Sequence, residues 1–153
     1  MIVAVAVALF LIVSTSLFHI SVLRWLSGGM SRIAMRANFR LLIIVIGSLG
    51  AHVIEVCFYS AAYFFCDNVL GLGTLSGRPV VAPLDYLYFS IVTYTSLGLG
   101  DVVPTGHLRF ITGIEALNGL LLIAWSGSFI YIAMGRLWPW RPCAEPTARP
   151  ANR

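Results

Sequence analysis

The amino-acid sequence predicts an all-α membrane protein with three spanning helices and one shorter, re-entrant helix. Hydrophobic residues make up 59% of the 153 residues and charged residues only 10%, whereas soluble domains carry about 25% charged residues. Three apolar segments, 2–23, 41–66 and 110–134, are long enough to cross a bilayer, which takes about 20 helical residues. A fourth apolar segment, 86–95, has about half that length. It therefore has to enter the membrane and turn back.

The first apolar segment is expected to be a retained helix rather than a cleaved signal peptide. A signal peptide has a positively charged start, a short apolar region and a small-residue cleavage site. Residues 2–23 carry no formal charge, are longer than such a region, and end at Arg24 and Trp25 as a membrane anchor would. We therefore assign residues 1–26 to an N-terminal transmembrane helix, with a signal-anchor origin as the alternative.

The distribution of arginine predicts the orientation of the chain, which has ten arginines and no lysine. Eight of them lie between the first two segments or after the third: Arg24, Arg32, Arg36, Arg40, Arg136, Arg141, Arg149 and Arg153. Positively charged loops stay on the cytoplasmic side of a membrane. We expect a multi-pass protein of the plasma or inner membrane, with the N-terminus and the loop 67–83 outside and the C-terminus in the cytoplasm. The formal charge of +4 then reports topology and does not indicate nucleic-acid binding.

The cytoplasmic basic linker, residues 27–40, holds arginines at every fourth position. On a short helix, Arg32, Arg36 and Arg40 would share one face and could touch anionic lipid head groups. The simpler interpretation, which we favour, is that they only determine topology. The tail 137–153 is rich in proline and arginine and is expected to be disordered in the cytoplasm.

The region between the second and third apolar segments has the pattern of a pore loop. Pro83 and Asp85 mark a helix start, and the short apolar helix leads into TSLGLGD, with Gly98 and Gly100 at alternate positions. Non-helical backbone at membrane depth is tolerated only where protein surrounds it or where it lines a watery path. A short helix, an irregular strand and a spanning helix therefore indicate a loop that lines a pore.

Glycines at alternate positions also have a chemical meaning in this loop. They allow positive φ angles, so that successive carbonyl groups can turn toward one axis. Four such loops around an axis form rings of carbonyl oxygens that replace the hydration shell of a cation. Each chain supplies one loop, so the site requires an oligomer, most simply a homotetramer.

Residues 41–136 resemble the pore module of potassium channels, in particular the small bacterial two-helix ion channel family. The resemblance rests on an outer helix, a pore helix, a filter and an inner helix in the same order. It implies a passive cation channel, most simply for potassium, whose only ligand is the permeant ion. The residues that would bind potassium are Thr95, Ser96, Leu97, Gly98, Leu99, Gly100 and Asp101. The implied parts are an outer helix 41–66, an extracellular loop 67–83, a pore helix 84–95, a filter 96–101, an inner helix 108–136 and a hinge at Gly119.

Two residues depart from the family pattern. Ser96 replaces the usual threonine, and Leu99 replaces the usual tyrosine, which in the family braces the filter by a hydrogen bond. The bracing would then come from packing against Tyr88 and Phe89, and we expect potassium to be preferred over sodium less strictly. A weakly selective monovalent cation channel and a non-conducting regulatory or assembly subunit remain alternatives.

Other polar residues allow several interpretations. Glu115 either supports the pore helix, raises the cation concentration in the cavity, or is a structural hydrogen-bonded acid. His52 and Glu55 lie three residues apart and can pair, whereas a zinc site would need more ligands. The second glycine run, LGLGT at 70–74, is interpreted as an extracellular loop. The sequence shows no nucleophile–base arrangement, so no enzymatic activity is expected.

Overall fold

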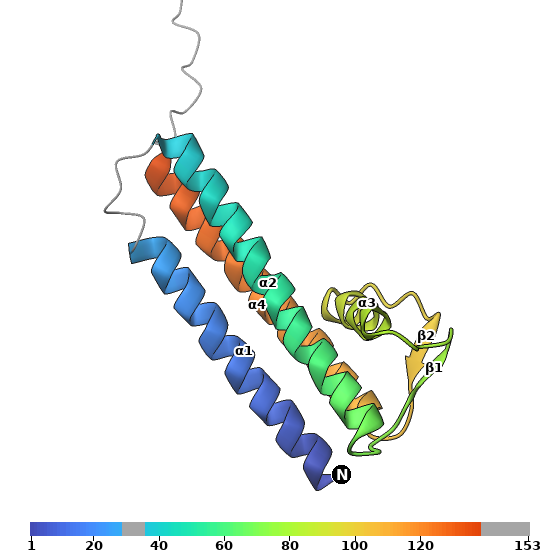
Figure 1. Ribbon diagram of the computed structural model, residues 1–153. Helices are drawn as coiled ribbons and strands as arrows, with labels where there is room; N and C mark the ends of the chain where they lie inside the picture. Colours follow the sequence, from blue (N-terminus) through green and yellow to red (C-terminus); the bar gives the residue numbers. More distant parts are fainter. Residues whose placement is uncertain (29–35, 139–153) are drawn as a thin grey trace, which may run out of the picture.

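Three long helices dominate the computed structural model, which describes residues 1–28 and 36–138. These helices, α1 (Ile2–Gly28), α2 (Ala37–Asn68) and α4 (Leu108–Leu137), lie side by side (Figure 1). Each is long and apolar enough to cross a membrane. The predicted fold class, an all-α membrane protein with three spanning helices, is confirmed.

Parts of the predicted linker and tail, including Arg32 and the three arginines after residue 138, lie outside the described residues. Arg36 occupies the N-cap position of α2 with extended backbone (φ −60°, ψ 140°). The helix therefore begins after Arg36, whose carbonyl accepts a hydrogen bond from the Arg40 backbone N–H at 3.1 Å. The alignment of these two arginines with Arg32 stays a prediction, because Arg32 is outside the described residues.

A smaller unit lies on the side of α2 and α4 away from α1 (Figure 1). It consists of α3 (Pro83–Tyr94) and the short strands β1 (Leu75–Gly77) and β2 (Val102–Pro104). The 12 residues of α3 span about 18 Å at 1.5 Å per residue, well short of the roughly 30 Å of a bilayer core.

The start of α3 is fixed by its own sequence. Pro83 sits in the first turn, where its missing N–H is not needed. The Asp85 carboxylate accepts hydrogen bonds from the backbone N–H groups of Val81 and Ala82, each 2.8 Å long. These bonds, that of Ala82 first, lower the pKa of Asp85, so the cap holds at neutral pH and weakens as acid protonates the carboxylate.

The two strands join the outer loop to the chain that leaves the predicted filter. They pair antiparallel, with Leu75 opposite Pro104 and Gly77 opposite Val102. Gly73, in the glycine run 70–74, approaches the Thr105 carbonyl so closely that any Cβ would overlap it. The glycine run 70–74, predicted to be part of an extracellular loop, is therefore packed against the segment that follows the predicted filter.

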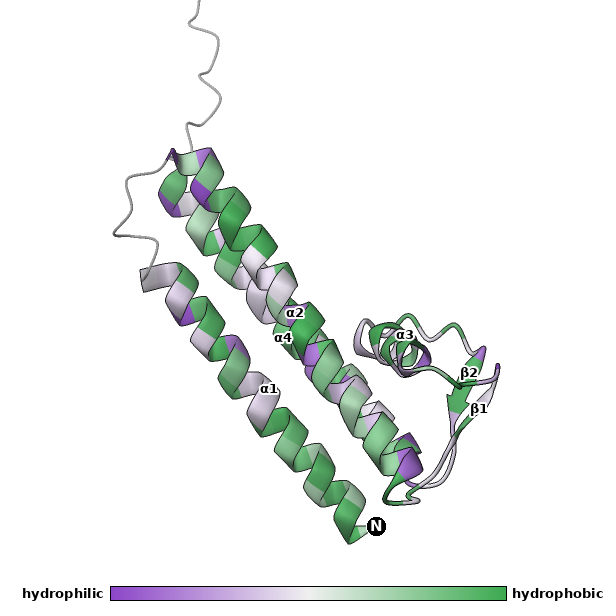
Figure 2. Ribbon diagram, in the orientation of Figure 1, coloured by the Kyte–Doolittle hydropathy of each residue, from purple (hydrophilic) through white to green (hydrophobic). Residues whose placement is uncertain are grey.

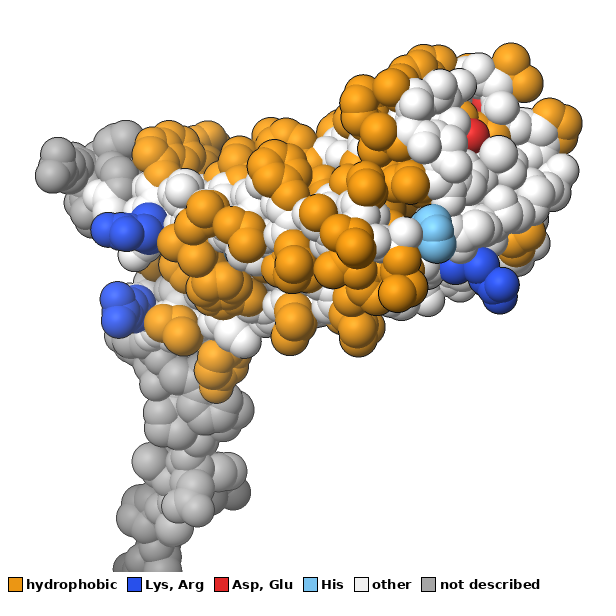
Figure 3. Space-filling model, turned by 90° about the horizontal axis from the view of Figure 1, so that it is seen from below, with side chains coloured by type: hydrophobic (Ala, Val, Ile, Leu, Met, Phe, Trp, Pro, Cys, Tyr) orange, Lys and Arg blue, Asp and Glu red, His pale blue; other side chains and the backbone are white. Residues whose placement is uncertain are grey.

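The bundle has an apolar outer surface, and a few polar residues lie among the hydrophobic ones of its interior. Side chains such as Phe10 and Leu17 face outward, and apolar residues dominate all three long helices (Figure 2). Figure 3 shows hydrophobic side chains over the visible face of the bundle, with arginines near its ends. His19, Glu55 and Glu115 are, by contrast, fully buried. Ionisable residues inside a membrane protein are costly and mark functional positions.

Candidate functional site

The predicted filter loop, residues 95–101, follows the last residue of α3, Tyr94, without a break. Thr95 is the C-cap, and its backbone N–H donates to the Ile91 carbonyl at 3.1 Å. The Thr95 hydroxyl donates to the same carbonyl at 2.7 Å. The end of α3 is thus hydrogen-bonded, and the loop leaves it from a fixed point.

Positive φ angles alternate along this loop. They occur at Ser96 (57°), Gly98 (55°) and Gly100 (79°). The spacing of the glycines predicted two of these angles, but not the one at serine, which rarely adopts them. The alternation is the backbone pattern that a column of carbonyl groups requires, although ion binding itself stays a prediction.

All residues from 95 to 100 are exposed in the single chain. Leu97 and Leu99 are 63% and 59% exposed, respectively. The loop therefore carries two large apolar side chains that no other part of the described chain covers.

The outer end of the loop is held at Asp101 from two directions. The Tyr88 hydroxyl of α3 donates to the Asp101 carboxylate at 2.9 Å, and this acceptor raises the pKa of Tyr88. The backbone N–H of Arg78, just after β1, donates to the Asp101 carbonyl at 2.9 Å. Gly77 passes so close to this carbonyl that a Cβ would overlap it. The loop 67–83 and α3 together fix this end of the predicted filter loop.

These contacts add a brace that the sequence did not predict. Packing of Leu99 against Tyr88 and Phe89 was expected, and it stays a prediction. Phe89 lies in the core, where its ring meets that of Tyr63 edge-on with centroids 5.0 Å apart. Tyr88 contributes a directional hydrogen bond to Asp101, two residues beyond Leu99.

Glu115 joins three helices behind the filter. Its carboxylate accepts hydrogen bonds from Ser90 of α3, at 2.6 Å, and from Tyr63 of α2. Its side chain is fully buried, which is the placement that support of the pore helix requires. A carboxylate that attracts cations into a cavity would need contact with water.

Gly119 lies against the end of α3. A Cβ at this position would overlap the carbonyl oxygen of Tyr94. Close approach of two helices is therefore a sufficient reason for glycine here, and the predicted hinge remains untested. A Cβ at Gly127, by contrast, would have open space around it out to 4 Å.

A second buried cluster lies beside Tyr94. The predicted pair of His52 and Glu55 is confirmed at 3.2 Å. His19 of α1 adds a contact to Glu55 at 2.8 Å, and Tyr94 donates to the same carboxylate. Ser126 of α4 completes the group. Sequence reasoning missed His19 because it lies 36 residues from Glu55.

This cluster brings together side chains of the kind that bind metals. Ligand-type atoms of His19, His52 and Glu55 lie within 4.8 Å of one another. These atoms are hydrogen-bonded to each other, however, and such bonds contain protons where a metal ion needs free lone pairs. We therefore assign no metal to the cluster.

The helix α1 has a further polar contact with the pore region. The Asn118 amide of α4 donates to the Thr15 hydroxyl at 2.9 Å and to the Tyr59 hydroxyl at 3.1 Å. Thr15 and His19 lie four residues apart, so they share one helical face. Two polar residues on one face of an apolar helix were the available signal that α1 packs on other helices.

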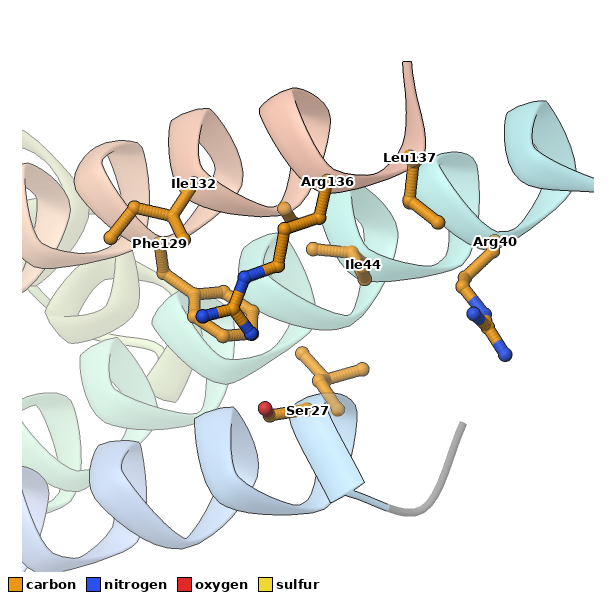
Figure 4. A pocket seen from close by; sticks show the side chains of 9 residues that line it. Ser27, Arg40, Ile44, Phe129, Ile132, Arg136 and Leu137 are labelled. Atoms are coloured by element: carbon orange, nitrogen blue, oxygen red, sulfur yellow. The ribbon is translucent and has the colours of Figure 1, made fainter. Parts of the chain in front are cut away.

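A pocket of about 240 Å³ lies where the end of α1 meets the start of α2 and the end of α4. Ser27, Arg40, Phe129 and Arg136 are among its lining residues. Figure 4 shows Arg136 extending from α4 over Phe129. The pocket combines basic and apolar groups at the end of the bundle that the sequence assigns to the cytoplasm.

A half-length helix, a loop of alternating positive φ angles and two flanking spanning helices define a pore-loop membrane protein. The family model described as "Ion channel" matches residues 51–136. This is more than half of the chain, and the protein belongs to the ion channel family. The matched segment includes α3 and the filter loop, whereas α1 lies outside it.

One curated relative extends this assignment. The inward rectifier potassium channel Kirbac3.1 of Paramagnetospirillum magnetotacticum is 30% identical over 88 residues. The match covers 57% of the present chain but only 28% of the relative. No solved structure gives a significant match.

Proposed function

We propose that the protein is a passive potassium-preferring cation channel, with a filter built from the loops of four copies. The alternating positive φ angles at Ser96, Gly98 and Gly100 carry this proposal. Such alternation lets carbonyl groups replace the hydration shell of an ion. The full exposure of the loop in one chain fits a site that other copies complete. The relative, named as a potassium channel, supports the choice of ion.

The orientation belongs to the same proposal. The arginine-rich ends of α1, α2 and α4 would face the cytoplasm, and the β1–β2 pair would face outward. The filter would then open toward the outer loop at Asp101 and toward the cell at Thr95.

The reversal potential of the purified full chain in lipid bilayers tests the proposed selectivity. With potassium on one side and sodium at equal concentration on the other, we expect the current to reverse at a voltage clearly displaced from zero, with the potassium side negative. Reversal near zero would indicate a non-selective cation pore. The absence of current from reconstituted, folded protein would favour the regulatory or assembly subunit.

A weakly selective channel is the second candidate, because Leu99 cannot donate a hydrogen bond. Leu99→Tyr restores a hydroxyl at this position and should increase the preference for potassium over sodium several-fold. An unchanged reversal potential in this variant would show that the Asp101 contacts alone set the geometry of the filter.

A further inference from the structure

The buried cluster beside the filter joins all four helices. His19 comes from α1, His52 and Glu55 from α2, Tyr94 from α3 and Ser126 from α4. Tyr94 is the last residue of α3, directly before the filter loop. We call these five residues the four-helix cluster.

The two imidazoles are held between the same two partners. Both Nδ1 atoms face the Glu55 carboxylate, at 2.8 Å for His19 and 3.2 Å for His52. Both Nε2 atoms lie 3.1 Å from the Ser126 hydroxyl oxygen. The Tyr94 hydroxyl donates to Glu55 and lies 3.0 Å from His52 Nδ1.

The number of protons in this network can be counted. Each imidazole has one contact with Glu55 and one with Ser126, and Tyr94 adds a fifth contact, to Glu55. The contact between His52 Nδ1 and the Tyr94 hydroxyl shares the proton that His52 Nδ1 directs toward Glu55. Each of the five contacts needs one proton between its two heavy atoms. With Glu55 ionised and both imidazoles neutral, only four are available, one from each imidazole and one from each hydroxyl. One contact would then place two lone pairs against each other.

We propose that the four-helix cluster is a proton-binding site, which holds one proton more than ionised Glu55 and two neutral imidazoles would. With this proton, one Nε2 donates to Ser126, and the Ser126 hydroxyl donates to the other Nε2. The added proton also removes the net negative charge of the cluster. A buried polar network is stable only when every member is satisfied, and an uncompensated charge inside a membrane protein is costly.

The ionisable groups next to the cluster have hydrogen-bond partners of their own. Among the described residues, Tyr59 and Glu115 act electrostatically on Tyr94 from outside the cluster. Glu115 is bound to Tyr63 and Ser90, and Tyr59 accepts a hydrogen bond from Asn118.

Loss of the proton has a structural consequence. One contact of the network must break, and each contact that can break joins two different helices or orients His52 toward Glu55. Tyr94 leads directly into the filter loop. Loss of the proton would therefore change the contacts that link α1 to this loop. A dependence of ion flux on pH follows from this inference together with the proposed channel function, whereas proton binding itself does not require conduction.

Ser126→Ala gives a specific test of the proton count. It removes both Nε2 contacts and one proton. The three contacts left at Glu55 are then satisfied by two neutral imidazoles and Tyr94, and the additional proton loses its hydrogen bonds. We expect its release to move to lower pH by about one unit or more, a loss of proton affinity of about tenfold or more.

Nitrogen NMR of the full chain, labelled with ¹⁵N-histidine in lipid bilayers, measures this directly. The chain has three histidines, so the exposed His107→Gln background leaves only the two cluster imidazoles. At about pH 7 we expect three of the four ring nitrogens to be protonated, both Nδ1 atoms and one Nε2, whereas two neutral imidazoles have only two protonated nitrogens. The third protonated signal should disappear as the pH rises, and Ser126→Ala should move this midpoint downward.

Two further variants control for non-specific effects. Ser126→Thr retains the hydroxyl and should keep the original midpoint. Ser128→Ala should also leave it unchanged, because the Ser128 hydroxyl is exposed and bonds to the Ala124 carbonyl. Only two protonated ring nitrogens from about pH 5 to 8 would overturn the proposal. So would an unchanged midpoint in Ser126→Ala, or both imidazoles shifting together to metal-bound positions on addition of Zn²⁺.

Discussion

At the scale of single residues, the Tyr88 hydroxyl is the side-chain contact that fixes the outer end of the filter loop. It reaches Asp101 at 2.9 Å, while the backbone of Arg78 holds the carbonyl of the same residue. The size of the carbonyl rings and the field strength of their dipoles both depend on how firmly the strand is held. We therefore expect changes in the contacts of Asp101 to alter the proposed selectivity without changing a carbonyl of the filter loop.

Tyr88→Phe removes this hydrogen bond and keeps the ring. Hydrogen bonds to charged groups are stronger than those between neutral groups, although water screens this one because Tyr88 is partly exposed. We expect the preference for potassium over sodium to fall several-fold, measured by reversal potential. Tyr131→Phe, at a tyrosine that is 74% exposed on α4, is the matched control. Equal reversal potentials in the Tyr88→Phe and parent channels would contradict the brace.

At the scale of elements, hydropathy and length predicted the long helices because those properties are local to each segment. The glycine spacing likewise predicted the left-handed angles at Gly98 and Gly100. The β1–β2 pair could not be predicted, since each strand has only three residues and the partners are far apart in sequence. The positive φ of Ser96 also had no local signal, because it depends on how the chain turns at the end of α3.

The helix α4 carries two glycines with different surroundings. Gly119→Ala would push α4 away from the Tyr94 carbonyl, and overpacking of this kind costs about 1–3 kcal/mol. We expect reduced selectivity together with altered gating, because Tyr94 adjoins the filter. Gly127→Ala meets no neighbour and removes only backbone freedom, worth about 1 kcal/mol in a helix.

Single-channel recording separates these two effects. If Gly127 is the flexible point, Gly127→Ala should change open probability and leave the reversal potential unaltered. An unaltered reversal potential in Gly119→Ala would show that α4 can move away from Tyr94 without disturbing the filter.

At the scale of the whole molecule, α1 is integrated into the channel domain by buried polar contacts. Thr15 bonds to Asn118 of α4 and His19 to Glu55 of α2. Sequence alone indicated that α1 is a membrane helix, but the partners of its polar face depend on three-dimensional packing. The pairing of His52 with Glu55 was predictable because both lie on one helix.

The exposed filter loop leads us to expect a homotetramer. Light scattering of the detergent-solubilised protein, corrected for bound detergent, should give four times the chain mass of 16.7 kDa. Ion flux from a preparation that is only monomeric or dimeric would contradict a site shared by four loops.

The most direct test of the central claim, that residues 95–101 form the ion filter, is potassium flux through Gly98→Ala in liposomes. Gly98 has a φ of 55°, a conformation that strains any residue with a Cβ, although open space surrounds the position. Gly113→Ala, on α4 and equally unobstructed, is the matched control. We predict that Gly98→Ala loses potassium flux while Gly113→Ala retains it, with both variants folded and equally incorporated. Flux through Gly98→Ala at the level of the parent protein would contradict the assignment of this loop as the filter.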